Sequence, residues 1–202
     1  MKKILVIDPY LDVLGGGEKH ILSIAKVLQE EGYQVFLASK IIGIEREIKD
    51  RFGFDGFKSE SYFYSMSFIK RFWYLRSFDF VFYVTDGSYF ISPAGKTVIF
   101  CMYPKKELYL GTFFNRLKWN ASQFISNSFF TKHYIDAWTK KKSTVIYPTL
   151  EHASFENFTQ QSKKTLSIIS VGRFYGHLHS KNHGFLIDSF NKLQAKDKRF
   201  KD

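Results

Sequence analysis

The chain has little cysteine, little proline and no long hydrophobic run, and each shortage excludes a class of protein. One cysteine, Cys101, in 202 residues excludes an intrachain disulfide and a multi-cysteine zinc site, and it is typical of a reducing compartment. Four prolines and 13 glycines are too few for a collagen-like or low-complexity chain. No stretch reaches the roughly 18–20 consecutive apolar residues that a membrane-spanning helix needs.

The N-terminus also lacks the features of a targeting segment. Only four apolar residues, 4–7, follow the basic start before Asp8, whereas a signal peptide needs roughly 7–15 apolar residues. We therefore expect a cytoplasmic protein, soluble or bound peripherally to the inner face of a membrane.

Negative charge is scarce in the second half of the chain. The whole chain has 30 Lys and Arg against 19 Asp and Glu, a formal net charge of +11. Residues 1–100 carry 13 basic against 12 acidic side chains, and residues 101–202 carry 17 against 7. Such an excess favours an anionic partner, which can be a phosphate group, an acidic lipid surface or a nucleic acid.

The first 38 residues have the pattern of a strand, a glycine loop, a helix and a second strand. Residues 3–8 are a short apolar run that ends at Asp-Pro, which predicts a buried parallel strand. Three glycines at 15–17 precede apolar residues at helical spacing, and residues 34–38 form the next apolar run. This order predicts an α/β protein with a Rossmann-like, doubly wound, mostly parallel sheet and a ligand site at the carboxyl ends of its strands.

Further elements follow the same alternation. We expect strands at 79–84, 97–101, 122–126 and 144–147, and a helix at 129–139. The polar stretch 151–165 is typical of a linker. A second unit then opens with a strand at 166–171 and a helix at 184–194.

The glycine loop has the geometry that holds a phosphate, because backbone N–H groups and the helix dipole converge there. A tight turn without a ligand is the alternative. The sequence GGGEKH departs from the dinucleotide pattern G-x-G-x-x-G, and no acid ends the second strand, which reads LASK at 37–40. No Lys-Ser/Thr pair follows the glycines, so a P-loop is excluded as well. An NAD enzyme and a Walker-type ATPase are therefore both poor fits.

Four segments in this order resemble the family-4 glycosyltransferases of GT-B fold. They are GGGEKHILSIAKVL at 15–28, IFCMYP at 99–104, SNSFFTKHYI at 126–135 with VIYPTLE at 145–151, and SVGRFYGHLHSKNHGFLIDSF at 170–190. The resemblance implies an acceptor-side domain at 1–150, a linker at 151–165 and the start of an incomplete nucleotide-sugar-binding domain at 166–202. It implies transfer of a sugar from a nucleotide-sugar to a glycan or lipid-linked acceptor in cell-surface polysaccharide synthesis. The anomeric configuration is retained, and neither a metal nor a resident cofactor is needed.

The resemblance also implies the donor-binding residues. Gly16 and Gly17 match the glycines that lie against the donor phosphates. Arg173 and Lys181 match the basic pair that neutralises the diphosphate leaving group, and they are the expected catalytic residues. Such a pair stabilises the negative charge that develops as the sugar–phosphate bond breaks. Without the resemblance, two solvated charges in a loop are the simpler explanation.

Two departures from the family pattern affect the expected activity. Met102 stands where the family has a cleft histidine. The family's two glutamates, seven residues apart in the donor domain, have no counterpart among the last acids of the chain, which are Glu151, Glu156, Asp188, Asp197 and Asp202. About half of the second domain is missing on this comparison, so we expect the 202-residue chain alone to be inactive in transfer.

Other polar residues are expected along the acceptor side of the cleft, with Met102. Asp86 follows an apolar strand and can touch an acceptor hydroxyl or simply form a turn. Asn127 and Ser128 lie where a strand meets a helix. Ser128 is most simply an N-cap, and contact with a ligand in the cleft is the second possibility.

The histidines predict no metal site. His177, His179 and His183 are irregularly spaced, and no carboxylate or cysteine completes a ligand set. His20 lies one turn into the first helix, where a surface position is the default and a position facing the cleft is the alternative.

Segment 62–78 mixes aromatic and basic side chains. Lys70, Arg71, Trp73 and Arg76 are candidate contacts to an anionic membrane, with rings at headgroup depth and cations on acidic lipid. The alternative is a helix that packs its aromatic rings into the core. A non-catalytic α/β module that binds anionic lipid or nucleic acid is the rival function, but no RNP, KH or helix-turn-helix pattern is present, and we expect no nucleic-acid partner.

Overall fold

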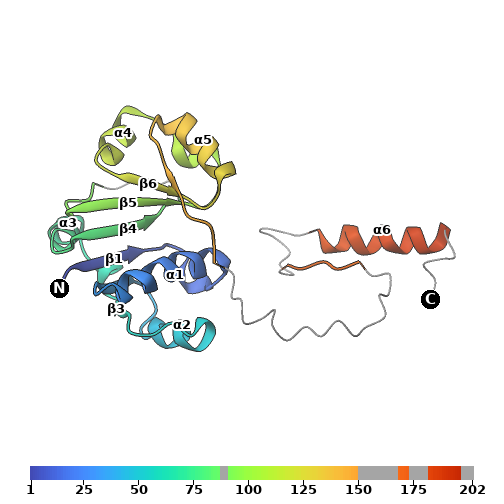
Figure 1. Cartoon of the computed structure of the whole chain (residues 1–202), viewed down its shortest axis with the longest axis horizontal. Helices are drawn as coiled ribbons and strands as arrows, with labels where there is room; N and C mark the ends of the chain where they lie inside the picture. The colour runs from blue at the N-terminus through green and yellow to red at the C-terminus, as the bar shows by residue number, and fades with distance from the viewer. Residues whose placement is uncertain (87–90, 150–167, 173–181, 197–202) are drawn as a thin grey trace. The chain divides into compact units, whose positions relative to one another are not determined.

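The computed structural model describes residues 1–86, 91–149, 168–172 and 182–196. The chain divides into two compact units, Met1–Glu151 and His152–Asp202, and each is described by itself (Figure 1).

The first unit is built on a seven-stranded sheet in which every neighbouring pair is parallel (Figure 1). The order is β3-β2-β1-β4-β5-β6-β7, so strand order reverses between β1 and β4. The strands are β1 (Lys3–Ile7), β2 (Gln34–Ala38), β3 (Lys58–Glu60), β4 (Phe80–Val84), β5 (Lys96–Cys101), β6 (Gln123–Ser126) and β7 (Thr144–Val145). The predicted Rossmann-like, doubly wound parallel α/β sheet is confirmed.

Helices cover both faces of this sheet. Two helices, α1 (Gly16–Glu30) and α2 (Ile44–Phe52), pack on one face. The opposite face is covered by short 3-10 turns and helices, namely η2 (Phe63–Ser65), α3 (Phe68–Leu75), η3 (Lys106–Tyr109), α4 (Phe113–Trp119) and α5 (Phe129–Thr139). A further 3-10 turn, η1 (Leu11–Val13), lies between β1 and α1.

The central strands are apolar on both sides because both faces of the sheet are covered. In β1, Ile4 and Val6 belong to the core under α1 and α2, while Leu5 and Ile7 belong to the core on the opposite face. All four side chains are buried. This explains why KILVI reads as a continuous apolar run rather than an alternating one.

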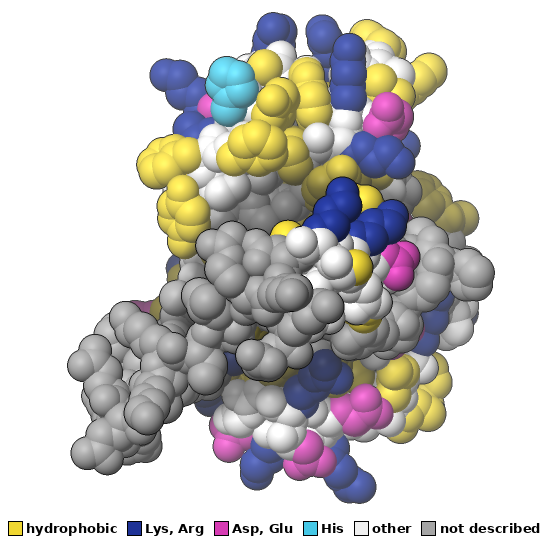
Figure 2. All heavy atoms as spheres, turned by 90° about the vertical axis from the view of Figure 1, so that its right-hand side faces the viewer, with side chains coloured by type: hydrophobic (Ala, Val, Ile, Leu, Met, Phe, Trp, Pro, Cys, Tyr) yellow, Lys and Arg dark blue, Asp and Glu magenta, His cyan; other side chains and the backbone are white. Residues whose placement is uncertain are grey.

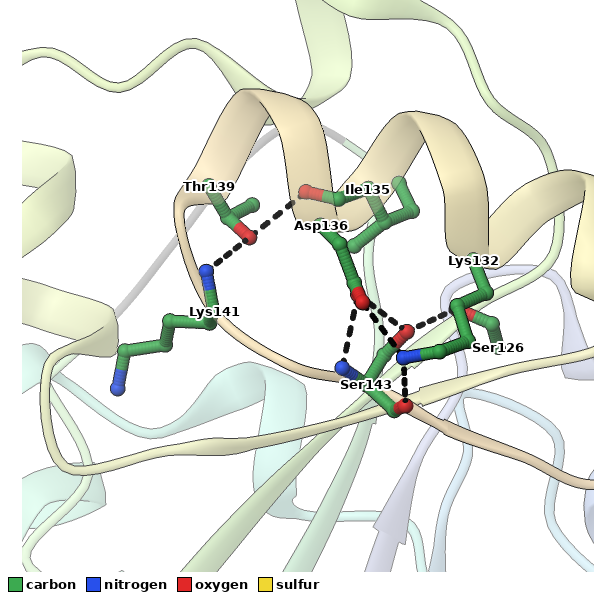
Figure 3. Close-up of polar contacts among 7 residues, drawn as sticks. All are labelled: Ser126, Lys132, Ile135, Asp136, Thr139, Lys141 and Ser143. Atoms are coloured by element: carbon green, nitrogen blue, oxygen red, sulfur yellow. Dashed lines mark hydrogen bonds and ion pairs between the residues drawn. The ribbon is translucent and has the colours of Figure 1, made fainter.

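A polar cluster ties α5 to the last strand (Figure 3). Asp136 Oδ1 accepts hydrogen bonds from Ser143 N and Ser143 Oγ, each at 2.8 Å. Lys132 Nζ lies 2.5 Å from Asp136 Oδ2 and donates to the Ser143 carbonyl. The hydroxyl of Ser126, from β6, donates to Ser143 Oγ at 2.9 Å. The cluster fixes α5 against the edge of the sheet that β6 and β7 form.

The described part of the second unit contains one helix, α6 (His183–Lys196), close to the predicted 184–194. The strand predicted at 166–171 is corrected in part, because residues 168–171 form no strand. A strand is held by a neighbouring ladder, and the described residues of this unit supply none; residues 166 and 167 lie outside them. An apolar pocket of about 260 Å³ lies between 168–170 and α6.

Candidate functional site

The reversal of strand order places a candidate site at the carboxyl ends of the central strands. In open α/β sheets, ligands bind outside these ends at the point where the order reverses. Here that point lies between β1 and β4. Asp8 follows β1, Met102 follows β5 and Asn127 follows β6, and the N-terminus of α1 lies at the same edge.

The glycine loop contains two glycines with different surroundings. A Cβ on Gly17 would lie 2.5 Å from the sulfur of Met102, whereas a Cβ on Gly16 would meet nothing within 4 Å. Gly17 therefore allows a close approach of α1 to the end of β5, and Gly16 faces open space. The N–H of Gly15 donates to Glu18 Oε2 at 2.5 Å, so a buried carboxylate holds the turn just before the helix.

Met102 and Asn127 are joined by a hydrogen bond between neighbouring strand ends. Asn127 Nδ2 donates to the Met102 carbonyl at 2.8 Å, and Asn127 Oδ1 accepts from Thr131 Oγ1 at 2.7 Å. Ser128 is the N-cap of α5, because its Oγ accepts from Thr131 N at 3.1 Å. These bonds explain Asn127 and Ser128 as parts of the framework that positions the end of β6.

Asp86 lies just after β4 and is half-buried. Its Oδ1 accepts a hydrogen bond from the hydroxyl of Tyr83 at 3.0 Å. This bond holds the carboxylate beside the end of β4 at the reversal point. There it stabilises the strand end and is placed to contact a ligand.

Asp8 is the most unusual polar residue at this edge, and the sequence analysis treated it only as the end of a strand. Its side chain is 2 % exposed. One oxygen, Oδ1, accepts from Tyr10 N at 2.9 Å, while Oδ2 is buried without a hydrogen-bond partner. The pKa of Asp8 is raised to about 7, mainly by burial and in smaller part by the nearby carboxylates of Glu18 and Asp12, against the opposing Tyr10 bond. An acid directly after the first buried strand is the signal that could have pointed to it.

A small polar pocket lies beside Asp8 and brings in Tyr64 from η2. The pocket holds about 40 Å³, and its lining includes Asp8, Ser39, Lys40 and Tyr64. The hydroxyl of Tyr64 is buried without a partner. Burial, followed by the charge of Asp8, raises the pKa of Tyr64 to about 12. No sequence pattern indicated Tyr64, because it lies in the stretch before α3, for which the spacing of apolar residues predicts neither a helix nor a strand.

His20 is buried, at 4 % exposure, and the default expectation of a surface position is wrong. Its ring meets Phe100 of β5 edge-on, with centroids 4.9 Å apart. Burial lowers the pKa of His20, while the backbone carbonyls of Ile146 and Tyr147 act in the opposite direction. His20 thus stays neutral and packs α1 onto the sheet, with its Nε2 unpaired.

The candidate membrane residues divide into exposed and internally bonded ones. Lys70 and Trp73 are exposed on α3, and Arg76 is exposed directly after that helix and lies over the Trp73 ring at 5.6 Å. Arg71 is half-buried, donates to two backbone carbonyls, and lies 4.9 Å from the centre of the Phe63 ring. Its guanidinium thus stabilises the fold of the segment.

A second group of exposed rings lies on α4 and α5. Figure 2 shows hydrophobic side chains mixed with Lys and Arg at the top of the molecule, where Figure 1 places these two helices. The exposed residues there are Phe113, Phe114, Leu117, Phe129, Phe130 and Tyr134.

No helix in the described ranges combines the length and the apolar character needed to cross a bilayer.

The predicted catalytic pair, Arg173 and Lys181, lies outside the described residues, as do His177 and His179. His183 begins α6, and its Nδ1 lies 3.0 Å from Ser170 Oγ. Within the described part of the chain, no cluster of three or more His, Cys, Asp or Glu side chains suits a metal ion.

Comparison with known proteins identifies the fold and no family. The chain matches no protein-family model and no curated protein. Among solved structures it is similar to a glycosyltransferase from Rickettsia africae ESF-5, with a TM-score of 0.50 and 16 % identity over 79 % of this chain and 46 % of that one. The chain thus spans less than half of that structure. A yeast methylglyoxal/isovaleraldehyde reductase, Gre2, solved with NADPH, aligns with a TM-score of 0.32 and 11 % identity over 50 % of this chain and 37 % of that one.

Proposed function

We propose that the chain belongs to a retaining GT-B glycosyltransferase of family-4 type, which transfers a sugar from a nucleotide-sugar to a glycan or lipid-linked acceptor. The observation that carries the proposal is the glycine turn of α1, which lies against Met102 at the carboxyl edge of a parallel sheet. The likeness of the fold to a glycosyltransferase structure supports it.

On this proposal, residues 1–150 form the acceptor side and residues 166–202 begin the donor side, joined by the linker 151–165. The N–H groups of the first helical turn of α1 have no intrahelical partners, as at any helix start. The exposed Gly16 leaves these groups open to a donor phosphate. Asp86, Asn127 and Met102 line the acceptor side at the neighbouring strand ends.

Arg173 and Lys181 carry the chemistry in this proposal. As the bond between the sugar and the diphosphate breaks, negative charge grows on the leaving group, and two cations beside it stabilise that charge more than they stabilise the bound donor. No metal or resident cofactor takes part; the nucleotide-sugar is a substrate. On this proposal the site needs a complete donor domain, of which residues 166–202 are the start.

The test is made in a protein that continues through a complete donor domain. Arg173→Ala and Lys181→Ala should each lower turnover by about 10²–10³-fold, the scale for one preorganised charge-stabilising group, with little change in the KM of the acceptor. Lys192→Ala, an exposed cation on α6, is the matched control and should leave turnover unchanged. Wild-type turnover in both test variants, or transfer by the 202-residue chain, would show that the chemistry lies elsewhere.

We also propose that the protein binds the anionic inner face of a membrane, where a lipid-linked acceptor would be found. The exposed rings and cations of α3, α4 and α5 support this. Binding to anionic lipid or nucleic acid without catalysis remains the rival function.

A further inference from the structure

The pocket beside Asp8 lies at the carboxyl ends of β1 and β2, and two of the side chains that line it carry unpaired buried oxygens. Asp8 Oδ2 and the Tyr64 hydroxyl belong to side chains that line this pocket, and neither has a hydrogen-bond partner. Buried polar groups in native proteins are almost always paired. Two unpaired buried oxygens in the lining of one pocket therefore indicate a ligand group that forms hydrogen bonds with both.

The two oxygens belong to side chains that line the same pocket, and they are not bonded to each other. The charge of Asp8 contributes to raising the pKa of Tyr64, and no hydrogen bond joins the two side chains. The pocket of about 40 Å³ exceeds the roughly 10–15 Å³ that one water-sized group requires. It has room for a hydroxyl group and the carbon that bears it.

The charges around the pocket select against an ionic ligand. Lys40 lies in the lining, with its Nζ 5.4 Å from the centre of the Tyr64 ring, and it disfavours a cation. Asp8 and Asp12 disfavour an anion. A hydroxyl group, of an alcohol or of water, is a neutral group that donates to a carboxylate and accepts from a phenol.

We propose that this pocket binds one hydroxyl of a neutral sugar, which donates a hydrogen bond to Asp8 Oδ2 and accepts one from the Tyr64 hydroxyl. The inference deepens the proposed function, on which it rests for the role of that sugar as part of the acceptor. No proton is transferred in this step; the pocket orients the sugar. Ser39 supports the wall of the pocket, because its Oγ accepts from Ile41 N at 2.9 Å.

The test uses the 202-residue chain with [13C]tyrosine labels and the methyl glycosides of glucose, galactose and mannose as probes, without any donor. At least one glycoside should shift the Tyr64 Cζ resonance, with a dissociation constant on the order of millimolar. Tyr64→Phe and Asp8→Asn should each weaken binding by about fivefold or more, followed at backbone amides around the pocket. Tetrahydropyran, a ring without hydroxyls, should cause no shift, and neither should tetramethylammonium.

Matched controls separate lost contacts from lost folding. Tyr62→Phe removes an exposed phenol two residues away, and Asp50→Asn removes an exposed carboxylate from α2; both should bind as the unaltered chain does. Unchanged circular dichroism and amide spectra verify that the test variants are folded. Absence of a Tyr64 shift with all three glycosides, equal affinity in the test variants, or a crystal structure with the glycoside that shows an ordered water only in the pocket would overturn the proposal.

The result of the glycoside-binding test can be distinguished from the result of the transfer test. Glycoside binding that depends on Asp8 and Tyr64, in a protein that continues through a complete donor domain yet transfers no sugar, would refute the proposed function and keep the sugar site. Conversely, transfer with an unchanged acceptor KM in both variants would keep the function and refute the site.

Discussion

Asp8 is an acid whose burial costs stability at neutral pH. Its pKa is about 7 in the folded chain against an ordinary value of 3.8, first because of burial and then because Glu18 and Asp12 lie near. Between these pH values the folded chain keeps a proton that the unfolded chain has lost. The free energy of unfolding therefore falls as the pH rises from about 4 to about 7 and stays low above that range.

Asp8→Asn should remove this pH-dependent cost. At pH 8 we expect the variant to be more stable by up to about 4 kcal/mol, the free energy of a shift of about three pKa units, and near pH 4 the two proteins should be almost equal. Urea unfolding at both pH values measures the difference. A stability gain that is the same at pH 4 and pH 8 would mean that ionisation of Asp8 is not its cause.

The two glycines at the start of α1 should respond differently to alanine. Gly16→Ala meets open space and should leave stability unchanged or raise it by up to about 1 kcal/mol, because alanine favours the helix. Gly17→Ala places its Cβ 2.5 Å from the Met102 sulfur and should cost about 1–2 kcal/mol. A double-mutant cycle with Met102→Ala should recover part of that cost. Equal effects at both glycines would contradict the close approach.

At the residue scale, the sequence predicted roles that depend on local chain geometry. Ser128 was expected as an N-cap because a hydroxyl precedes a helical pattern, and the structure confirms it. Asp8 and Tyr64 are brought together by strand order and by the fold of 61–66, which no local pattern encodes. His20 was predicted at the surface but is buried. Phe100 and the segment after β7, both distant in sequence, lie against its side chain.

At the element scale, α5 depends on the polar cluster that joins it to β7. Burial works against ionisation of Asp136, but Lys132 and the Ser143 hydrogen bonds hold its pKa below the ordinary value. The ionised carboxylate thus contributes stability that is present above the ordinary pKa and is lost as the pH falls through the lowered folded-state pKa.

Asp136→Ala should destabilise the first unit by about 1–3 kcal/mol at pH 7, because Lys132 and Ser143 lose charge-assisted bonds. Chemical unfolding followed by circular dichroism measures the effect. Asp50→Ala, which removes an exposed acid from α2, is the control and should change stability little. The effect of Asp136→Ala should shrink in strongly acidic solution; a constant difference across pH would rule out the carboxylate as its source.

Elements with a strong apolar period were predictable, and short or edge elements were not. The helix expected at 129–139 has those bounds in the structure, and five predicted strands match observed ones within one residue at each end. β3 reads Lys-Ser-Glu and lies at the sheet edge, where pairing with β2 rather than apolar character defines it. α3 exposes Phe68, Ile69 and Trp73, so its apolar residues do not mark a buried face.

At the scale of the whole molecule, the strand order explains why polar residues from distant segments gather at one edge. Every strand is parallel, so all carboxyl ends lie on the same side, and the glycine turn of α1 lies there too. The opposite face of the sheet carries the helices with exposed rings, away from α1 and α2.

Membrane binding is the prediction that this arrangement makes for the whole molecule. Trp73 on α3 and Phe113 and Phe114 on α4 are 60 %, 71 % and 72 % exposed, and Lys70 on α3 and Arg76 directly after it lie beside Trp73. Rings at headgroup depth and cations on acidic lipid add to binding, at about 1 kcal/mol for each basic residue near the surface. Co-sedimentation with vesicles should therefore rise with their content of phosphatidylglycerol.

The charge reversal Lys70→Glu/Arg76→Glu should lower the fraction bound to such vesicles by at least about tenfold, because two attractions become repulsions. Lys49→Glu/Arg51→Glu makes the same change in net charge on α2, which covers the other face of the sheet, and should bind nearly as the unaltered protein does. Equal losses in the two variants would indicate that net charge alone attracts the protein. Indifference to lipid charge, together with salt-sensitive binding to a labelled oligonucleotide, would favour the nucleic-acid alternative instead. If only the Lys70→Glu/Arg76→Glu variant loses vesicle binding, the membrane contacts the side of the sheet that α3, α4 and α5 cover, opposite α1 and α2.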